Sequence, residues 1–184
     1  MHLMPYIDSL WFGEGFDYSA GPAYWLVESS GIPFGLMGDM MGAGHVWRGM
    51  LHGMTTRFRC ADPSALWRLW DAFGMGNSTM VGYWDEMPVV TTSCTAVLAT
   101  AYVIQASATM VAIASWGGEE ELCSLHFEWE SLGLKPAGVK LYAPDLISLG
   151  QPGPASIPLR KEDKFAPAIK FAAGGGAVLI LESV

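Results

Sequence analysis

The chain has 184 residues, a formal net charge of −8, 51% hydrophobic residues and only 15% charged residues. This composition belongs to a folded protein with much apolar surface to bury, and it excludes a disordered chain. Nothing resembles a basic patch, so nucleic acid is not an expected partner, and no apolar run reaches the roughly 18 residues of a membrane span.

The first predicted element is an apolar strand within residues 6–18, YIDSLWFGEGFDY. Two glycines break it, and around the break lie the carboxylates Asp8, Glu14 and Asp17 and the indole of Trp11. A buried strand that ends in such a turn is how an α/β barrel builds the rim of its active site. Carboxylates beside aromatic rings also suit a sugar site. The alternative is that these acids only cap the turn, because turns attract Asp and Gly.

Two weaker elements follow. A helix is predicted over residues 22–28, with proline in its first turn. Residues 34–41 are apolar but rich in glycine, so they would need packing partners to hold as a helix.

Residues 47–54 are predicted to form a strand, because their side chains alternate in size and polarity. Arg48 and His52 would share one face of this strand, and Trp47 would lie on the other. An arginine in such a strand needs an acidic partner or an anionic ligand, and a structural ion pair and substrate binding both stay open.

A clearer helix begins at Asp62 and Pro63, which suit the cap and the first turn. Its apolar residues recur at helical spacing, and a glycine at 74 or 76 ends it. The apolar stripe consists of Leu66, Leu69, Trp70 and Phe73. Up to here the order is strand, helix, strand, helix, which is typical of βα units in a parallel sheet.

From about residue 78 short strands replace the helices, and the boundary between the two parts is placed near Asn77. Short strands separated by Gly and Pro indicate an antiparallel β-sandwich. Residues 105–108 lie between two strands at hairpin distance. The predicted strands are 80–84, 97–104, 109–116, 122–129, 139–143, 156–159, 168–172 and 177–182. The strand at 122–129 alternates cleanly, with Cys123, Leu125, Phe127 and Trp129 facing inward.

The three cysteines, Cys60, Cys94 and Cys123, are odd in number and widely spaced. They indicate neither a disulfide framework nor a metal site, so buried free thiols are expected. The four histidines are scattered, and no metal or other cofactor is predicted. The N-terminus lacks the regions of a signal peptide. If Met1 is the natural start, this chain has no export signal, and its localisation stays open.

Several segments, in order along the chain, carry a resemblance to a known family. They are IDSLWFGEGFDY, YWLVESSGIPFGLMGDM, WRGMLHGMT, LWRLWDAFG, VGYWD and LYAPDL. Over most of residues 6–151 the chain resembles the C-terminal third of glycoside hydrolase family 123-like proteins. The resemblance implies an α+β multidomain fragment, in which residues 1–77 are the last two βα units of a (β/α)8 barrel and residues 78–184 are an antiparallel β-sandwich. The N-terminal half of the barrel, absent here, would then be its partner.

The resemblance also implies a function. In family 123 an adjacent Asp–Glu pair performs substrate-assisted hydrolysis of N-acetylgalactosamine glycosides, and that pair has no counterpart in this chain. We expect a fragment of a glycoside hydrolase that contributes groups to the active-site rim, is inactive alone, and has a carbohydrate as its substrate. The candidates are Glu14 and Asp8 as acid or base, Trp11 and Trp47 for stacking on sugar, and Asp17 and Arg48 for binding hydroxyls. The alternatives are a carbohydrate-binding accessory module without catalysis and an inactive structural fragment.

Overall fold

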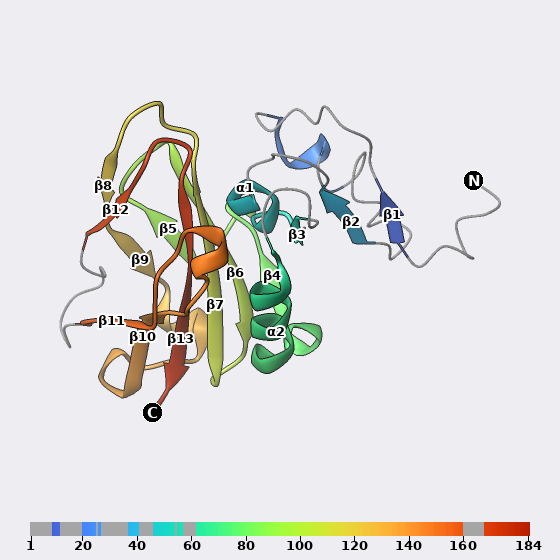
Figure 1. The fold of residues 1–184 in the computed structure, drawn as a ribbon. Helices are drawn as coiled ribbons and strands as arrows, with labels where there is room; N and C mark the ends of the chain where they lie inside the picture. The colour runs from blue at the N-terminus through green and yellow to red at the C-terminus, as the bar shows by residue number, and fades with distance from the viewer. Residues whose placement is uncertain are drawn as a thin grey trace.

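The computed structural model describes residues 9–11, 20–24, 26, 37–40, 46–53, 55–56, 62–159 and 168–184. A short parallel sheet near the N-terminus precedes a larger antiparallel β domain (Figure 1). Within the described residues, no helix is both long and apolar enough to cross a membrane.

The parallel sheet has three strands in the order β1 (Ser9–Trp11), β2 (Met37–Met40) and β3 (Thr55–Thr56). Both pairs are parallel, as expected for this part of the chain. The glycine-rich segment at 34–41 supplies the central strand and not a helix. A central strand gains hydrogen bonds from two neighbours, which offsets the low strand propensity of glycine. Of the helix predicted over residues 22–28, Pro22 and Ala23 are α-helical, and Tyr24 and Leu26 are π-helical.

The strand predicted at 47–54 is wrong, because Val46–Met50 forms the short helix α1 and a turn follows it. Trp47, Met50 and Leu51 are all buried. They are spaced i, i+3 and i+4, so they share one face of a helix, whereas a strand would have split them between two faces. Burial of this stripe against the large sheet therefore decides the conformation.

Helix α2 (Ser64–Phe73) confirms the predicted helix, but Pro63 and not Asp62 occupies the N-cap position. Asp62 accepts the Ser64 N–H at 2.9 Å just before the first turn. Gly74 ends the helix with a left-handed φ of 78°, a conformation that costs glycine little. Leu66 and Trp70 are buried as expected.

The antiparallel prediction is confirmed for the six-stranded sheet, whose order is β11-β10-β13-β7-β6-β4. Its strands are β4 (Thr79–Val81), β6 (Val97–Ile104), β7 (Ala108–Ser115), β10 (Val139–Ala143), β11 (Ala155–Ile157) and β13 (Gly176–Ser183). Two antiparallel pairs accompany it, β8 (Glu121–Cys123) with β12 (Ile169–Phe171), and β5 (Val90–Thr92) with β9 (Leu125–Phe127). Short helical turns are η4 (Met75–Asn77), α3 (Trp129–Leu132), η5 (Pro136–Gly138) and η6 (Ile147–Leu149).

The large sheet buries both of its faces, so it forms the middle layer of the domain (Figure 1). Along β7, Val111 and Ile113 belong to one core cluster, while Met110 and Ala112 belong to the other. This is the alternation that a strand imposes. The first cluster lies against the two small sheets, and the second lies against α1 and α2.

The strand predicted at 122–129 is correct in its inward face but not in its length. Cys123, Leu125 and Phe127 are buried. The segment changes partner at residue 124, however, since β8 pairs with β12 and β9 pairs with β5. Trp129 begins the helical turn α3 instead of ending the strand.

The prediction of free thiols is wrong for two of the three cysteines. Cys94 and Cys123 form a disulfide with their Cα atoms 5.6 Å apart, within the usual range. They are 29 residues apart in sequence, and only the packing of β8 beside the loop after β5 brings them together. Cys60 lies outside the described residues.

Candidate functional site

The parallel sheet provides one edge at which strand ends meet. Trp11 is the last residue of β1, and it is level with Asp39 of β2, which pairs with Thr55 of β3. Because all three strands are parallel, their carboxyl ends share this edge, where α/β proteins build ligand sites. The backbone register therefore places Trp11, a predicted sugar-stacking residue, at a suitable edge.

The three candidate carboxylates flank the same strand in sequence. Asp8 directly precedes β1, and Glu14 and Asp17 follow its end. All three lie outside the described residues, so their roles remain predictions.

Trp47 packs α1 onto the large sheet. Its side chain is 9% exposed and belongs to the core cluster on this face. Gly176 at the start of β13 allows this contact, because a Cβ there would lie 2.5 Å from the Trp47 Cβ and 2.3 Å from the Ile113 carbonyl oxygen. The glycine thus lets the helix approach the strand backbone closely.

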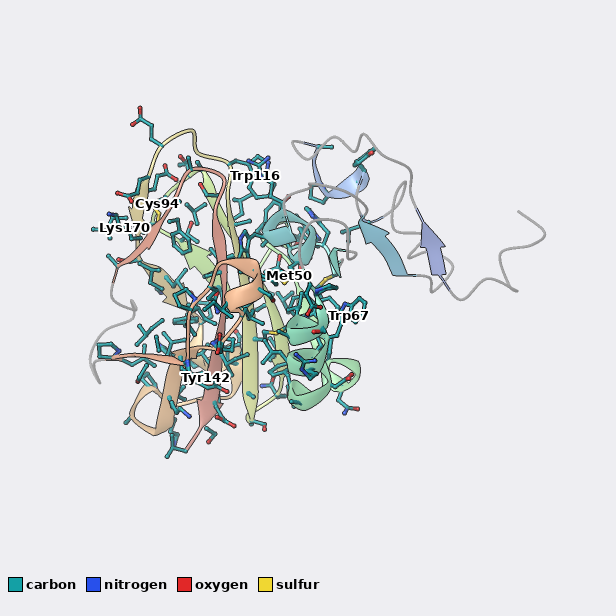
Figure 2. The ribbon with its side chains drawn as sticks, viewed as in Figure 1. Met50, Trp67, Cys94, Trp116, Tyr142 and Lys170 are labelled. Atoms are coloured by element: carbon teal, nitrogen blue, oxygen red, sulfur yellow. A yellow bond between two sulfur atoms is a disulfide. The ribbon has the colours of Figure 1, made fainter. Side chains whose placement is uncertain are left out.

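The Arg48 side chain reaches from α1 to the end of β7. Its Nε and Nη2 donate to the Ser115 carbonyl oxygen at 3.3 and 3.2 Å. The guanidinium carbon lies 4.6 Å from the centre of the Trp116 ring, a cation–π contact. Figure 2 labels Trp116. Partial burial lowers the pKa of Arg48, which still leaves it charged near neutral pH. A charged guanidinium is thus held beside an aromatic ring at the end of β7.

His52 is fully buried within an aromatic group at the end of α1. Its ring stacks on Trp84 at a centroid distance of 5.3 Å, and its Nε2 lies 3.4 Å from the Tyr83 hydroxyl. Its Nδ1 lies 3.2 Å from the Arg48 carbonyl oxygen. Burial lowers the pKa of His52 to about 4, so the imidazole is neutral at pH 7. A neutral, enclosed ring suits packing rather than proton exchange with a substrate.

Tyr102 of β6 connects the sheet to the backbone of α1. Its buried hydroxyl donates to the Met50 carbonyl oxygen. Burial raises the pKa of Tyr102, and a hydrogen bond from the Gly53 N–H opposes part of that rise. We call α1 and its contacts with β6, β7 and β13 the α1 joint. Because β3 begins only five residues after α1 ends, the α1 joint constrains where the last parallel strand can lie.

A cavity of about 230 Å³ lies between α2 and the large sheet. Its lining includes the aromatic rings of Phe73 and Tyr142 together with Ser107 and Glu182. The Lys140 ammonium lies 4.4 Å from the centre of the Tyr142 ring and 3.9 Å from the Glu182 carboxylate. Apolar ring faces beside hydrogen-bonding groups are what a small polar ligand with one apolar face requires.

A second cavity, of about 220 Å³, lies along β5 and β6. Tyr83, Thr91 and Thr95 contribute its polar groups, and Val90 and Leu98 belong to its apolar wall. Tyr83 therefore connects this cavity with the aromatic group around His52.

Two of the candidate site residues lie in an element of a different kind from the one predicted. Trp47 and Arg48 do lie in one element, but that element is a helix against the sheet. The aromatic partners Tyr83, Trp84 and Trp116 were not recognised as a group. The signal in the sequence was that Tyr83 and Trp84 follow β4 after one glycine and that Trp116 follows β7 directly.

The described chain is therefore a short segment of parallel strands followed by an antiparallel β domain. Two family models match it in order along the sequence. "Glycoside hydrolase 123, TIM-barrel domain" matches residues 1–59, and "Glycoside hydrolase 123, C-terminal domain" matches residues 62–182. The chain belongs to the glycoside hydrolase 123 family, as its resemblance predicted. Neither a curated protein nor a solved structure matched the chain.

Proposed function

We propose that this chain is the C-terminal part of a glycoside hydrolase that cleaves O-glycosidic bonds of a carbohydrate. In this proposal, residues 1–77 form the last two βα units of a (β/α)8 barrel, and residues 78–184 form an accessory β-sandwich. The observation that supports it most is that a barrel-domain match is followed by a C-terminal-domain match, and that strand pairing changes from parallel at β3 to antiparallel at β4. The two matches meet between residues 59 and 62, ahead of the boundary proposed at residue 77.

The parallel sheet would supply part of the active-site rim. Rim groups at the carboxyl ends of barrel strands come from several strands, which makes the segment after β1 the most suitable part of this chain. The proposed roles are those of acid or base for Glu14 and Asp8, sugar stacking for Trp11, and hydroxyl binding for Asp17 and Arg48. The predicted stacking role of Trp47 is not kept, because its ring is buried between α1 and the large sheet. If two of the carboxylates form a catalytic pair, their separation would be roughly 5–5.5 Å for retention or roughly 6.5–9.5 Å for inversion.

The α1 joint gives the β domain a role in this proposal. Trp47 rests on Gly176, and Met50 is hydrogen-bonded to Tyr102, so the helix before β3 is fixed to the large sheet. The β domain would then hold the end of the barrel in place, which preserves the geometry of rim groups within the tolerance that catalysis demands.

The test is hydrolysis of aryl glycosides, N-acetylgalactosaminides included, by this chain together with the barrel sequence that precedes it. Loss of an acid or base normally lowers turnover by about 10²–10⁴-fold, and we expect this for Glu14→Gln or Asp8→Asn. The matched control is Glu119→Gln, since Glu119 is an exposed carboxylate in the turn after β7. Unchanged turnover in both variants would remove these two residues from the mechanism.

A second candidate function is carbohydrate binding without catalysis, and the cavity between α2 and the large sheet favours it. Tyr142 offers an aromatic face there, and Glu182 offers hydrogen-bond acceptors. Calorimetric titration of the 184-residue chain with monosaccharides tests this candidate. Binding that is lost in Tyr142→Ala would support it, whereas no binding by the unaltered chain would favour a purely structural fragment.

A further inference from the structure

One cluster of side chains outside the proposed hydrolase site has the composition of a metal site. The sulfur atoms of Cys94 and Cys123 and a carboxylate oxygen of Glu121 all lie within 4.8 Å of one another. Glu121 and Cys123 are two residues apart in β8, so they share one face of the strand. Cys94 joins them from the loop between β5 and β6, at the end of the domain where Figure 2 labels it.

One oxygen of the Glu121 carboxylate, Oε2, is buried without a hydrogen-bond partner within the described part of the chain, and this arrangement is destabilising. The nearby Lys170 ammonium is 2.9 Å from the carboxylate of Glu120, the preceding residue. A buried carboxylate oxygen without a partner is unfavourable, because it has lost water and gained nothing in exchange. A cation bound beside this oxygen would remove that penalty.

The Glu121 carboxylate packs against the backbone of Gly117, in the turn that precedes β8. A Cβ added at Gly117 would lie 3.0 Å from the Glu121 Oε2 and 3.2 Å from its Cδ. A side chain at position 117 would therefore require the carboxylate to shift by a few tenths of an ångström from its observed position. An alanine at this point would push the carboxylate away while leaving both cysteines unchanged.

We propose that the reduced form of this cluster binds Zn²⁺ through the thiolates of Cys94 and Cys123 and the carboxylate of Glu121. Two thiolates with one oxygen suit a borderline-soft ion such as Zn²⁺ better than Mg²⁺ or Ca²⁺. Two zinc–sulfur bonds of about 2.3 Å in a tetrahedral site separate the sulfur atoms by about 3.8 Å, so the disulfide must be reduced before the sulfurs can take these positions. That separation is still below the 4.8 Å within which the three ligand atoms lie. Water would complete the fourth position.

Metal binding and the disulfide exclude each other. A two-electron reductant, a dithiol in a cell, gives two electrons and two protons to the disulfide and is itself oxidised, which yields two cysteine thiols. Zn²⁺ then displaces the two thiol protons, and the resulting site carries one net negative charge. The cluster is thus a disulfide under oxidising conditions and a zinc site under reducing conditions. The inference is independent of the proposed hydrolase activity.

The experiment uses the 184-residue chain in a Cys60→Ser background, so that the third thiol cannot contribute. The chain is reduced with a phosphine, freed of reductant without oxygen, and titrated with Co²⁺ and then Zn²⁺. We expect thiolate-to-cobalt charge-transfer absorption that Zn²⁺ abolishes at one ion per chain. The oxidised chain should bind neither ion at this site.

Three variants test the ligand set. Glu121→Gln should weaken zinc binding by more than about tenfold, and Gly117→Ala should weaken it in the same direction. The matched control is Gly118→Ala, since a Cβ there meets no atom within 4 Å, and its affinity should be unchanged. The proposal is overturned if the reduced chain binds neither ion, or if Glu121→Gln and Gly117→Ala bind zinc like the parent. Circular dichroism follows folding in parallel, and a reduced chain that stays unfolded with Zn²⁺ present also overturns it.

Discussion

The hydroxyl of Tyr102 offers the clearest measure of how strongly the α1 joint is held. It is a fully buried polar group in the core cluster between α1 and the large sheet, and it donates to the Met50 carbonyl oxygen. Replacement of Tyr102 by Phe keeps the ring and removes only this oxygen. The Met50 carbonyl would then be buried without its partner, and the Gly53 N–H would lose an acceptor.

The expected loss follows from the cost of an unsatisfied buried group. Tyr102→Phe should lower the free energy of unfolding by about 1–3 kcal/mol. For a chain of this size such a loss lowers Tm by about 2–12 °C. Urea unfolding followed by tryptophan fluorescence is a suitable assay, because Trp47 and Trp70 lie in the same core cluster.

The control is Tyr142→Phe, since that ring is only partly buried and its strand β10 lies toward the opposite edge of the sheet from β6. This variant should change stability by no more than about 0.5 kcal/mol. Equal stability of Tyr102→Phe and Tyr142→Phe would refute the conclusion that the Tyr102 hydroxyl fastens α1 to the sheet.

Three further predictions concern the same scaffold. The pKa of His52 is lowered to about 4 in the folded chain, below its usual value near 6.5. As the pH falls, the unfolded chain therefore binds a proton before the folded chain does. The free energy of unfolding should decline between about pH 6.5 and pH 4, by up to about 3 kcal/mol. In His52→Gln, urea midpoints at pH 7 and pH 4.5 should differ less than in His126→Gln, and equal differences would contradict this. Gly176→Ala should lower the free energy of unfolding by about 1–3 kcal/mol in urea, because the added Cβ overpacks the contact with Trp47 and Ile113. Gly138→Ala is the control, since its added Cβ would have no atom within 4 Å, and it should leave the stability unchanged. Similar urea midpoints for the two variants would contradict this prediction. Gln151→Leu removes three buried hydrogen bonds to backbone groups and should lower Tm by at least about 2 °C, so an unchanged Tm would argue that these bonds are not needed.

Local patterns predicted the elements whose neighbours in sequence already specify them. Helix α2 begins after Asp62 and Pro63 and ends at Gly74, because caps and apolar spacing act within a few residues. The hairpin of β6 and β7 and the inward face of Cys123, Leu125 and Phe127 followed from the same short-range signals. Family membership also followed from ordered sequence segments.

Long-range packing decided the rest. Residues 47–54 have a pattern that fits a strand locally, and burial of Trp47, Met50 and Leu51 against the large sheet made the first part of that segment a helix. The glycine-rich segment around Asp39 became a central strand because a neighbour on each side supplies its hydrogen bonds. Neither outcome is encoded in a window of ten residues.

The sequence by itself therefore determined the family, the change from an α/β segment to antiparallel strands and the ends of α2, because those properties depend on motifs and short-range spacing. Only the tertiary structure decided that Cys94 meets Cys123, that Arg48 lies over Trp116 and that His52 is enclosed by Tyr83 and Trp84. Each of these contacts joins residues about 30 or more positions apart, and they meet because burial of both faces of one sheet brings distant segments together.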